Sequence, residues 1–118
     1  MILLDANVIL RYLLNDNADM VKEVSDFFAK SKGFVRYEVL AEVVHVLSKL
    51  YTMPKSDISA SLQAFINEPN VETESKAVLE LALKTFGVIN LDFVDCLLYA
   101  FRAVHGYEVF TLDKKTRN

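Results

Sequence analysis

The sequence alternates short apolar runs with longer stretches that have the spacing of amphipathic helices, and this alternation strongly restricts the possible folds. We expect strands at residues 2–4, 34–36, 70–73 and 108–112, the third with the weakest pattern and the last with the clearest, and a brief extended piece at 88–90. We expect helices at residues 8–13, 18–31, 37–50, 54–66, 75–87 and 92–105. The sequence therefore predicts an α/β fold, a three-layer α/β/α sandwich with a mainly parallel central sheet.

Length and composition predict one folded domain that covers residues 1–118. Hydrophobic residues make up 53% of the chain, with only three Gly and two Pro, which argues against disorder. The longest apolar stretch, residues 88–104, carries Asp92, Asp95 and Arg102, so we do not expect it to span a membrane. The single cysteine, Cys96, excludes an intramolecular disulfide; it is expected to be a small buried residue, in a reducing, cytoplasmic setting.

The net charge of −3 argues against a simple basic protein that binds nucleic acid through a positive face. That objection weakens if the acidic residues are clustered to hold cations, because bound metal ions reverse the local field. The positions of the acidic residues therefore decide how the charge is interpreted.

Acidic residues follow several of the expected strands. Asp5 comes directly after the first strand and Asp113 directly after the last. Glu42 lies in the second turn of the helix after the second strand, and Asp92 and Asp95 open the last helix. Because functional groups collect at the carboxyl ends of parallel strands, we expect these acids to map to one edge of the sheet.

Helix geometry refines the expectation for three of these acids. Glu42 lies at the margin of the apolar arc of its helix, so its carboxylate is expected to be half-buried and rigidly held. Asp92 and Asp95 are three residues apart and share one side of their helix, opposite an apolar stripe formed by Phe93, Leu97, Phe101 and Val104.

Carboxylates that converge in a half-buried cleft repel one another, and a hard divalent cation relieves that repulsion. Mg²⁺ and Mn²⁺ are the metals that suit oxygen ligands. A metal ion held in this way can activate water and neutralise the charge of a phosphodiester, as in nucleases.

Each of these acids also has a purely structural interpretation. For Asp5, a role as helix N-cap alone and a role as metal ligand are equally well supported by its position. For Asp92, the position favours a cap over a ligand. Asp95 suits the first turn of a helix, Glu42 an ordinary boundary position and Asp113 a turn. The prediction of a metal site therefore rests on their coincidence.

The other polar candidates carry weaker signals. His45 shares a polar helix face with Lys49, and His105 suits the end of a helix, so a solvated role is favoured for both. The basic end at residues 114–117 is expected to be solvated, with phosphate contact as the alternative. The two His and one Cys support neither a zinc site nor a Cys–His nucleophile, and there is no glycine-rich phosphate loop.

Four segments, residues 3–13, 39–44, 92–98 and 110–115, resemble in order and spacing the four motifs of PIN-domain proteins, especially the VapC-like toxins of toxin–antitoxin pairs. The resemblance covers nearly the whole chain. It implies a metal-dependent endoribonuclease that uses Mg²⁺ or Mn²⁺, is usually dimeric and is held inactive by a cognate antitoxin. It also implies roles for individual residues: metal ligands at Asp5, Glu42, Asp95 and Asp113, an auxiliary acid at Asp92, and hydrogen-bonding residues that orient the ligands at Asn7 and Thr111. Ala6 departs from the pattern, because this position is often Thr in the family.

Two other classes of function remain open. A phosphoryl-aspartate phosphatase or regulator would use Asp5 as the acceptor, but a phosphatase of that kind would need a second aspartate where this chain has Asn7. A receiver-like regulator would pair acids after its first strand, which this sequence does not do. A non-catalytic binding module would keep the fold and bind a protein partner, and the presence of all the expected acids counts against it.

Overall fold

The computed structural model describes residues 1–112, which form short strands that alternate with longer helices. The elements in chain order are β1 (Ile2–Leu3), α1 (Ala6–Leu14), α2 (Ala18–Lys30), β2 (Gly33–Val35), α3 (Tyr37–Lys49), α4 (Lys55–Ile66), β3 (Val71–Thr73), α5 (Lys76–Val88) and α6 (Phe93–His105). The predicted α/β fold with a parallel sheet is confirmed, and so is the weakest of the predicted strands, which is β3.

The sheet has the order β1-β2-β3, and both pairs of neighbouring strands are parallel. In β2, Gly33 lies opposite Ile2 of β1 and Val71 of β3. A Cβ atom at Gly33 would lie 2.6 Å from the side chain of Leu4, so a larger residue here would force the Leu4 side chain to shift.

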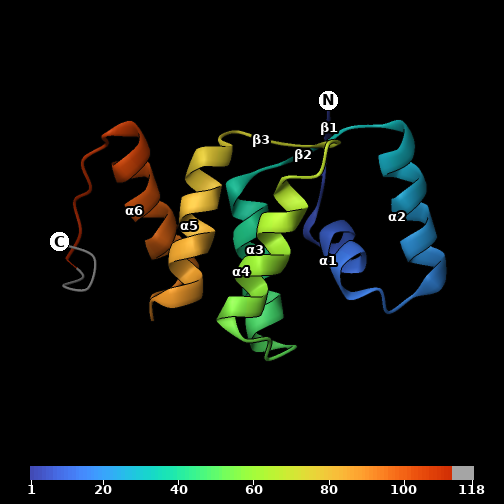
Figure 1. Ribbon diagram of the computed structural model, residues 1–118, viewed down its shortest axis with the longest axis horizontal. Coiled ribbons are helices and arrows are strands. Elements are labelled where there is room, and N and C mark those ends of the chain that lie inside the picture. The colour runs from blue at the N-terminus through green and yellow to red at the C-terminus, as the bar shows by residue number, and fades with distance from the viewer. Residues whose placement is uncertain (113–118) are drawn as a thin grey trace.

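The helices stand in a row with the short strands running across its top, as Figure 1 shows. One end of the row is α2 and the other is α6, followed by the C-terminal segment; β1 lies toward the α2 end. The molecule is correspondingly elongated, with extents of 45 × 30 × 18 Å.

One hydrophobic core joins residues from β1 to α6 and includes the fully buried Ile9, Leu40, Leu62 and Leu83. α6 packs against α5 mainly through buried Phe93, Cys96, Leu97 and Ala100. The predicted apolar stripe of this helix is therefore correct for Phe93 and Leu97, whereas Val104 is 39% exposed near its end.

Local signals fix the ends of several helices. The Ser75 hydroxyl accepts a 3.2 Å hydrogen bond from the backbone N–H of Val78 and caps α5, as its position predicts. Gly106 ends α6 in the left-handed conformation with φ of 72°, which glycine adopts without strain. Among the described helices, none is long and apolar enough to cross a membrane.

Two predicted extended segments are wrong. Residues 108–112 do not form a strand, although their sequence pattern is the clearest in the chain. The physical reason is position: α6 packs on α5 at one end of the row, and none of the strands found in residues 1–112 lies beside the segment that follows it. Residues 88–90 are not a separate extended piece either, since Val88 is the last residue of α5.

Candidate functional site

Asp5 lies between the end of β1 and the start of α1. Its side chain accepts a 3.0 Å hydrogen bond from the backbone N–H of Val8, and it is therefore the N-cap of α1. The residue is exposed, so the second carboxylate oxygen is open to solvent or a ligand. The structure thus confirms the capping role that its position suggested and leaves room for a second role.

Asn7 lies in the first turn of α1. Its amide oxygen accepts a 3.3 Å hydrogen bond from Nε of Arg11, which also pairs with Asp16 at 2.5 Å. The hydrogen bond to Asp16 is the main cause that raises the pKa of the Arg11 guanidinium. Asn7 is therefore already held in place by a neighbour on its own helix.

Glu42 lies in the second turn of α3, as predicted, but its environment differs from the prediction. The sequence predicts a half-buried carboxylate, whereas the residue is exposed, next to the buried Val43 and Val44. Within residues 1–112, no ion pair or hydrogen bond holds its side chain. The reason is that the core side of α3 ends at these valines, so the neighbouring glutamate projects into solvent.

Asp92 and Asp95 lie at the start of α6. Asp92 is the N-cap by position: its backbone carbonyl accepts a 3.1 Å hydrogen bond from the N–H of Cys96, but its side chain makes no capping hydrogen bond. Asp95 follows in the first turn and is half-buried. The structure therefore leaves both carboxylates uncommitted, contrary to the expectation that the Asp92 side chain acts as a cap.

Both aspartates line a cleft of about 740 Å³ between α3 and the start of α6. Polar residues on its other walls are His45, Ser48, Lys49, Lys55 and Asn90. The cleft thus places carboxylates from α6 opposite an imidazole and ammonium groups from α3 and α4. Its volume is in the range of sites that hold small-molecule ligands.

Lys55 fixes one wall of this cleft. Its ammonium group donates hydrogen bonds to the backbone carbonyls of Ile89, at 3.2 Å, and Leu91, at 2.6 Å. The same group lies 4.3 Å from the centroid of the Phe86 ring, a favourable cation–π distance. Lys55 therefore ties the start of α4 to the loop that leads into Asp92.

The described residues do not bring the predicted acids into one group. Within residues 1–112 there is no set of three or more His, Cys, Asp or Glu side chains close enough to hold a metal ion. Asp92 and Asp95 share the cleft, whereas Asp5 and Glu42 are not among its lining residues. Thr111 is half-buried in the segment after α6, and Asp113 lies outside the described residues.

Comparison with known proteins identifies the family. Residues 2–118 match the sequence model of the PIN domain family. The chain belongs to the PIN domain family. A VapC ribonuclease of Aquifex aeolicus (strain VF5) is 29% identical over 100 residues, which cover 80% of this chain and 73% of that protein. No solved structure has a significant match to this PIN domain.

The donor chemistry of the PIN domain fits a divalent cation, although residues 1–112 hold no complete ligand set. Carboxylate oxygens are hard ligands of the kind that Mg²⁺ and Mn²⁺ prefer. Asp92 and Asp95 form no ion pair within the part of the chain that is described, so their oxygens are not neutralised by a neighbouring cation. These residues are the two predicted acids that line one cleft.

Sequence reasoning missed the basic side of the cleft in this PIN domain. His45 and Lys49 are exposed, as expected for a solvated helix face, and both also line the cleft that contains Asp92 and Asp95. Their spacing of four residues places them on one face of α3, which was a visible signal. Lys55 carried no such signal, because its contacts are with residues 34 and 36 positions away in the chain.

Proposed function

We propose that this PIN domain protein is a metal-dependent endoribonuclease that acts as the toxin of a toxin–antitoxin pair. The observation that carries the proposal is the family match over residues 2–118, because that range contains all four acid-bearing motifs. The similarity to a VapC ribonuclease over 80% of the chain supports RNA as the substrate. The cleft between α3 and α6 supports a site of suitable size on this chain.

The proposed metal ligands are the motif acids Asp5, Glu42, Asp95 and Asp113, with Asp92 as an auxiliary acid. When bound, Mg²⁺ or Mn²⁺ would supply an activated water for in-line attack on an RNA phosphodiester, leaving a 5′-phosphate and a 3′-hydroxyl. Residues 1–112 hold no preassembled set of three ligands. We therefore propose that binding of the cation draws together the segments that carry these acids.

The chain's own polar residues have proposed roles in binding and orientation. Lys49 and His45 are proposed to contact phosphate groups of the RNA in the cleft, opposite Asp92 and Asp95. Asn7 and Thr111 are proposed to orient the carboxylates, since a carboxylate without a hydrogen-bonding partner swings away from a metal. We further propose a cognate antitoxin as the regulatory partner, a homodimer as the active form and, because RNA is the substrate, a cytoplasmic location.

The experiment that tests this function is cleavage of a labelled RNA pool with Mn²⁺ or Mg²⁺ and with EDTA. We expect cutting that requires the metal and that Asp5→Asn or Asp95→Asn lowers by at least about 100-fold, as for loss of an essential charged group. Asp26→Asn is the matched control, because Asp26 is an exposed aspartate on α2 without a side-chain partner among the described residues. This variant is expected to cut RNA like the wild type.

The other outcomes separate the rival functions. Cutting that survives both Asp5→Asn and EDTA would come from a contaminating ribonuclease and would count against the proposal. If nothing is cut and calorimetry finds no Mn²⁺ binding, the protein is a binding module rather than a nuclease. Phosphorylation of Asp5 by a small phosphodonor would instead support the phosphoryl-aspartate class.

A further inference from the structure

Four aromatic side chains gather where the start of α3 meets the end of α6. Tyr37 and Phe101 form the base of this group, with ring centroids 5.1 Å apart and an edge-on angle of 73°. The rings of His105 and Tyr107 lie 6.2 Å and 6.1 Å from the ring of Phe101, and 5.5 Å from each other. These separations are those of interacting aromatic rings. We call these four residues the aromatic cluster.

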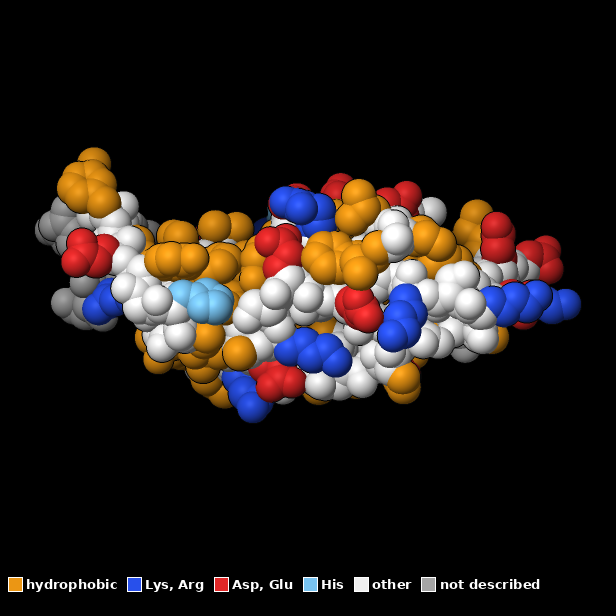
Figure 2. Space-filling model, turned by 90° about the horizontal axis from the view of Figure 1, so that it is seen from above, with side chains coloured by type: hydrophobic (Ala, Val, Ile, Leu, Met, Phe, Trp, Pro, Cys, Tyr) orange, Lys and Arg blue, Asp and Glu red, His pale blue; other side chains and the backbone are white. Residues whose placement is uncertain are grey.

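The outer part of the aromatic cluster is open to solvent. Tyr37 and Phe101 are half-buried and hold the end of α6 against α3. His105 is exposed, and Tyr107 is 59% exposed. Seen from above, a histidine lies among hydrophobic side chains toward the C-terminal end of the molecule (Figure 2). The cluster therefore presents aromatic surface that the packing of α6 does not use.

The aromatic cluster and the acid-lined cleft lie at opposite ends of the same two helices. Lys49 at the end of α3 and Asp95 at the start of α6 line the cleft, whereas Tyr37 begins α3 and His105 ends α6. The cluster is at the end of the helices nearer the strands (Figure 1). From Asp95 to Phe101 the rise along α6 is about 9 Å. A short single strand of nucleic acid can therefore contact both the cluster and the cleft.

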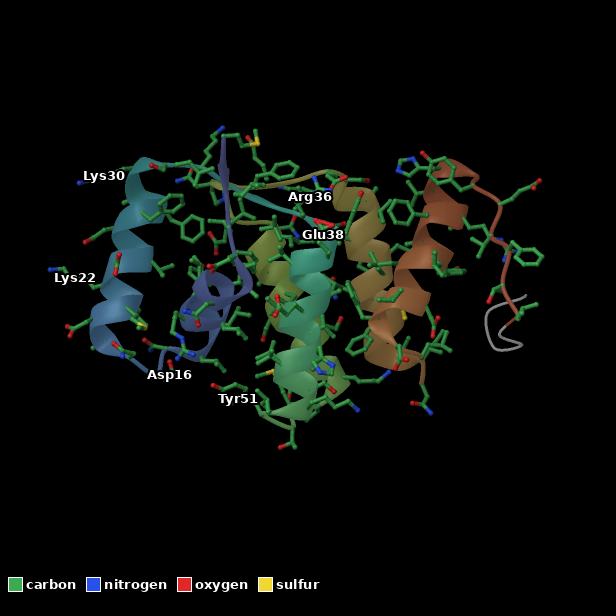
Figure 3. All side chains as sticks on the ribbon, turned by 180° about the vertical axis from the view of Figure 1, so that it is seen from behind. Asp16, Lys22, Lys30, Arg36, Glu38 and Tyr51 are labelled. Atoms are coloured by element: carbon green, nitrogen blue, oxygen red, sulfur yellow. The ribbon has the colours of Figure 1, made fainter. Side chains whose placement is uncertain are left out.

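The charges beside the aromatic cluster allow a polyanion to approach. Glu38 and Glu74 both pair with Arg36, whose Nη1 lies 3.9 Å from the Glu74 carboxylate. Figure 3 shows Arg36 and Glu38 together at this end of α3. Arg102 is exposed, forms no ion pair within residues 1–112, and shares a side of α6 with His105, three residues later. Arg102 can therefore contact a phosphate group next to the rings.

We propose that the aromatic cluster is a stacking site for the unpaired bases of single-stranded RNA, with Arg102 on an adjoining phosphate. The inference rests on the proposed nuclease function, because the RNA that stacks here is the strand that enters the cleft. Aromatic side chains stack on every type of base, since every base has a π-face. The bases of a duplex are already stacked on one another, so their faces are covered. The cluster thus favours single-stranded segments without selecting a sequence.

The first test measures the binding of a labelled, unpaired RNA oligomer in EDTA. Tyr107→Leu removes the most accessible tyrosine ring of the cluster and keeps an apolar side chain, so it should lower the affinity at least about fivefold. The salt slope of the affinity should stay the same, because stacking releases no counterions. Arg102→Gln should instead reduce the salt slope by about 1.

Tyr99→Leu is the matched control for this measurement. Tyr99 is 49% exposed on α6, but it lies on a different side of the helix from Phe101 and makes no ring contact within residues 1–112. This variant should bind the oligomer like the wild type. An equal loss for Tyr99→Leu and Tyr107→Leu would overturn the stacking site.

The second test uses fluorescence, because the chain contains no tryptophan. Tyr107→Trp places one indole in the aromatic cluster and keeps a ring that stacks on bases, so its affinity should be at least that of the wild type. Its emission should be quenched by the RNA oligomer and not by an oligomer of the same length with abasic sugars. Tyr99→Trp should be quenched by neither. If both oligomers quench Tyr107→Trp equally, or neither does, the stacking site is overturned.

The outcomes separate this site from the proposed nuclease. If the wild type cuts RNA and Tyr107→Leu binds the oligomer equally well, the stacking site is overturned and the nuclease stands. The same holds if the wild type cuts RNA but does not bind the oligomer in EDTA. Base-dependent binding without any cutting supports the stacking site and overturns the nuclease. A wild type that neither binds nor cuts RNA overturns both.

Discussion

The ammonium group of Lys55 donates a 2.6 Å hydrogen bond to the backbone carbonyl of Leu91, the residue directly before Asp92. This contact joins the start of α4 to the start of α6 across 36 positions of the chain. It fixes the loop that presents Asp92 and Asp95 to the cleft. The stability of the molecule and the position of its proposed acids are therefore connected through one lysine.

Lys55→Met should destabilise the protein, because it removes the two hydrogen bonds to Ile89 and Leu91 while keeping an apolar side chain of similar length. Hydrogen bonds that involve a charged group are each worth about 1.5–3 kcal/mol, so we expect a loss of about 2 kcal/mol in the free energy of unfolding, measured with urea. Lys84→Met is the matched control, since Lys84 is an exposed lysine on α5, and it should change little. An equal loss for both variants would contradict the anchoring role of Lys55.

Two substitutions at Asp5 should separate its capping role from its proposed metal role. Asparagine retains an oxygen that accepts the hydrogen bond from Val8, whereas alanine does not. Asp5→Asn should therefore keep nearly wild-type stability, and Asp5→Ala should lose about 1 kcal/mol of the free energy of unfolding. Both should abolish metal-dependent cleavage. Cleavage that falls only in the alanine variant would show that Asp5 acts as a cap alone.

Lys49→Gln should weaken RNA binding if the cleft between α3 and α6 holds the phosphate backbone. Binding would be measured in EDTA, so that cleavage does not intervene, at several salt concentrations. Removing one phosphate contact should lower the affinity several-fold and reduce the salt slope by about 1.

Lys22→Gln is the control for this measurement. Lys22 projects from α2 at the end of the molecule away from α6, as Figure 3 shows. Lys22→Gln removes the same positive charge as Lys49→Gln without changing the cleft. If the two variants lower the affinity equally, the effect comes from net charge and the cleft is not the RNA site.

Stability should fall as the solution becomes alkaline. Burial raises the pKa of the Cys96 thiol above its ordinary value of 9.0, with smaller contributions from Asp95 and Asp92. The folded chain therefore holds this proton more tightly than the unfolded chain does. The stabilisation is complete below pH 9 and is lost as the pH rises toward the folded pKa, at no more than about 1.4 kcal/mol per pH unit.

Urea unfolding between pH 7 and pH 10 measures this effect, and Cys96→Ala should show a smaller decline over the same range. Burial also raises the pKa of Tyr12 and Tyr37 above 10.0, which continues the decline at higher pH. In the folded state the thiol should react slowly with iodoacetamide, since it is buried and protonated. A stability that increases from pH 9 to pH 10 would contradict this prediction.

Patterns of neighbouring residues were sufficient to predict most of the elements. The spacing of Leu40, Val43, Val44 and Leu47 predicts α3, because helix periodicity is a property of adjacent turns. The caps at Ser75 and Gly106 are likewise read from a few adjacent positions. The acid-bearing motifs are also local patterns, and the family match confirms the resemblance that they suggested.

The site could be predicted only in part. The sequence indicates which acids are candidates, but it does not indicate that Glu42 is exposed or that the Asp92 carboxylate makes no capping bond. Whether Asp5, Glu42 and Asp95 converge depends on where α6 packs, and that depends on contacts between elements far apart in the chain. The same limit explains why the sequence predicted a solvated face at His45 and Lys49 but not the cleft that these exposed residues line.

The sequence by itself determined the alternation of strands and helices, the α/β class and the family of this protein, because each depends on residue types at short, fixed spacings. The tertiary structure decided which of these segments meet. The segment 108–112 has a clear strand pattern and forms no strand, since a strand needs a neighbour and α6 is packed away from β1. Lys55 anchors the loop before α6 because folding brings the backbone carbonyl of Leu91 next to its ammonium group. No local sequence pattern contains that contact.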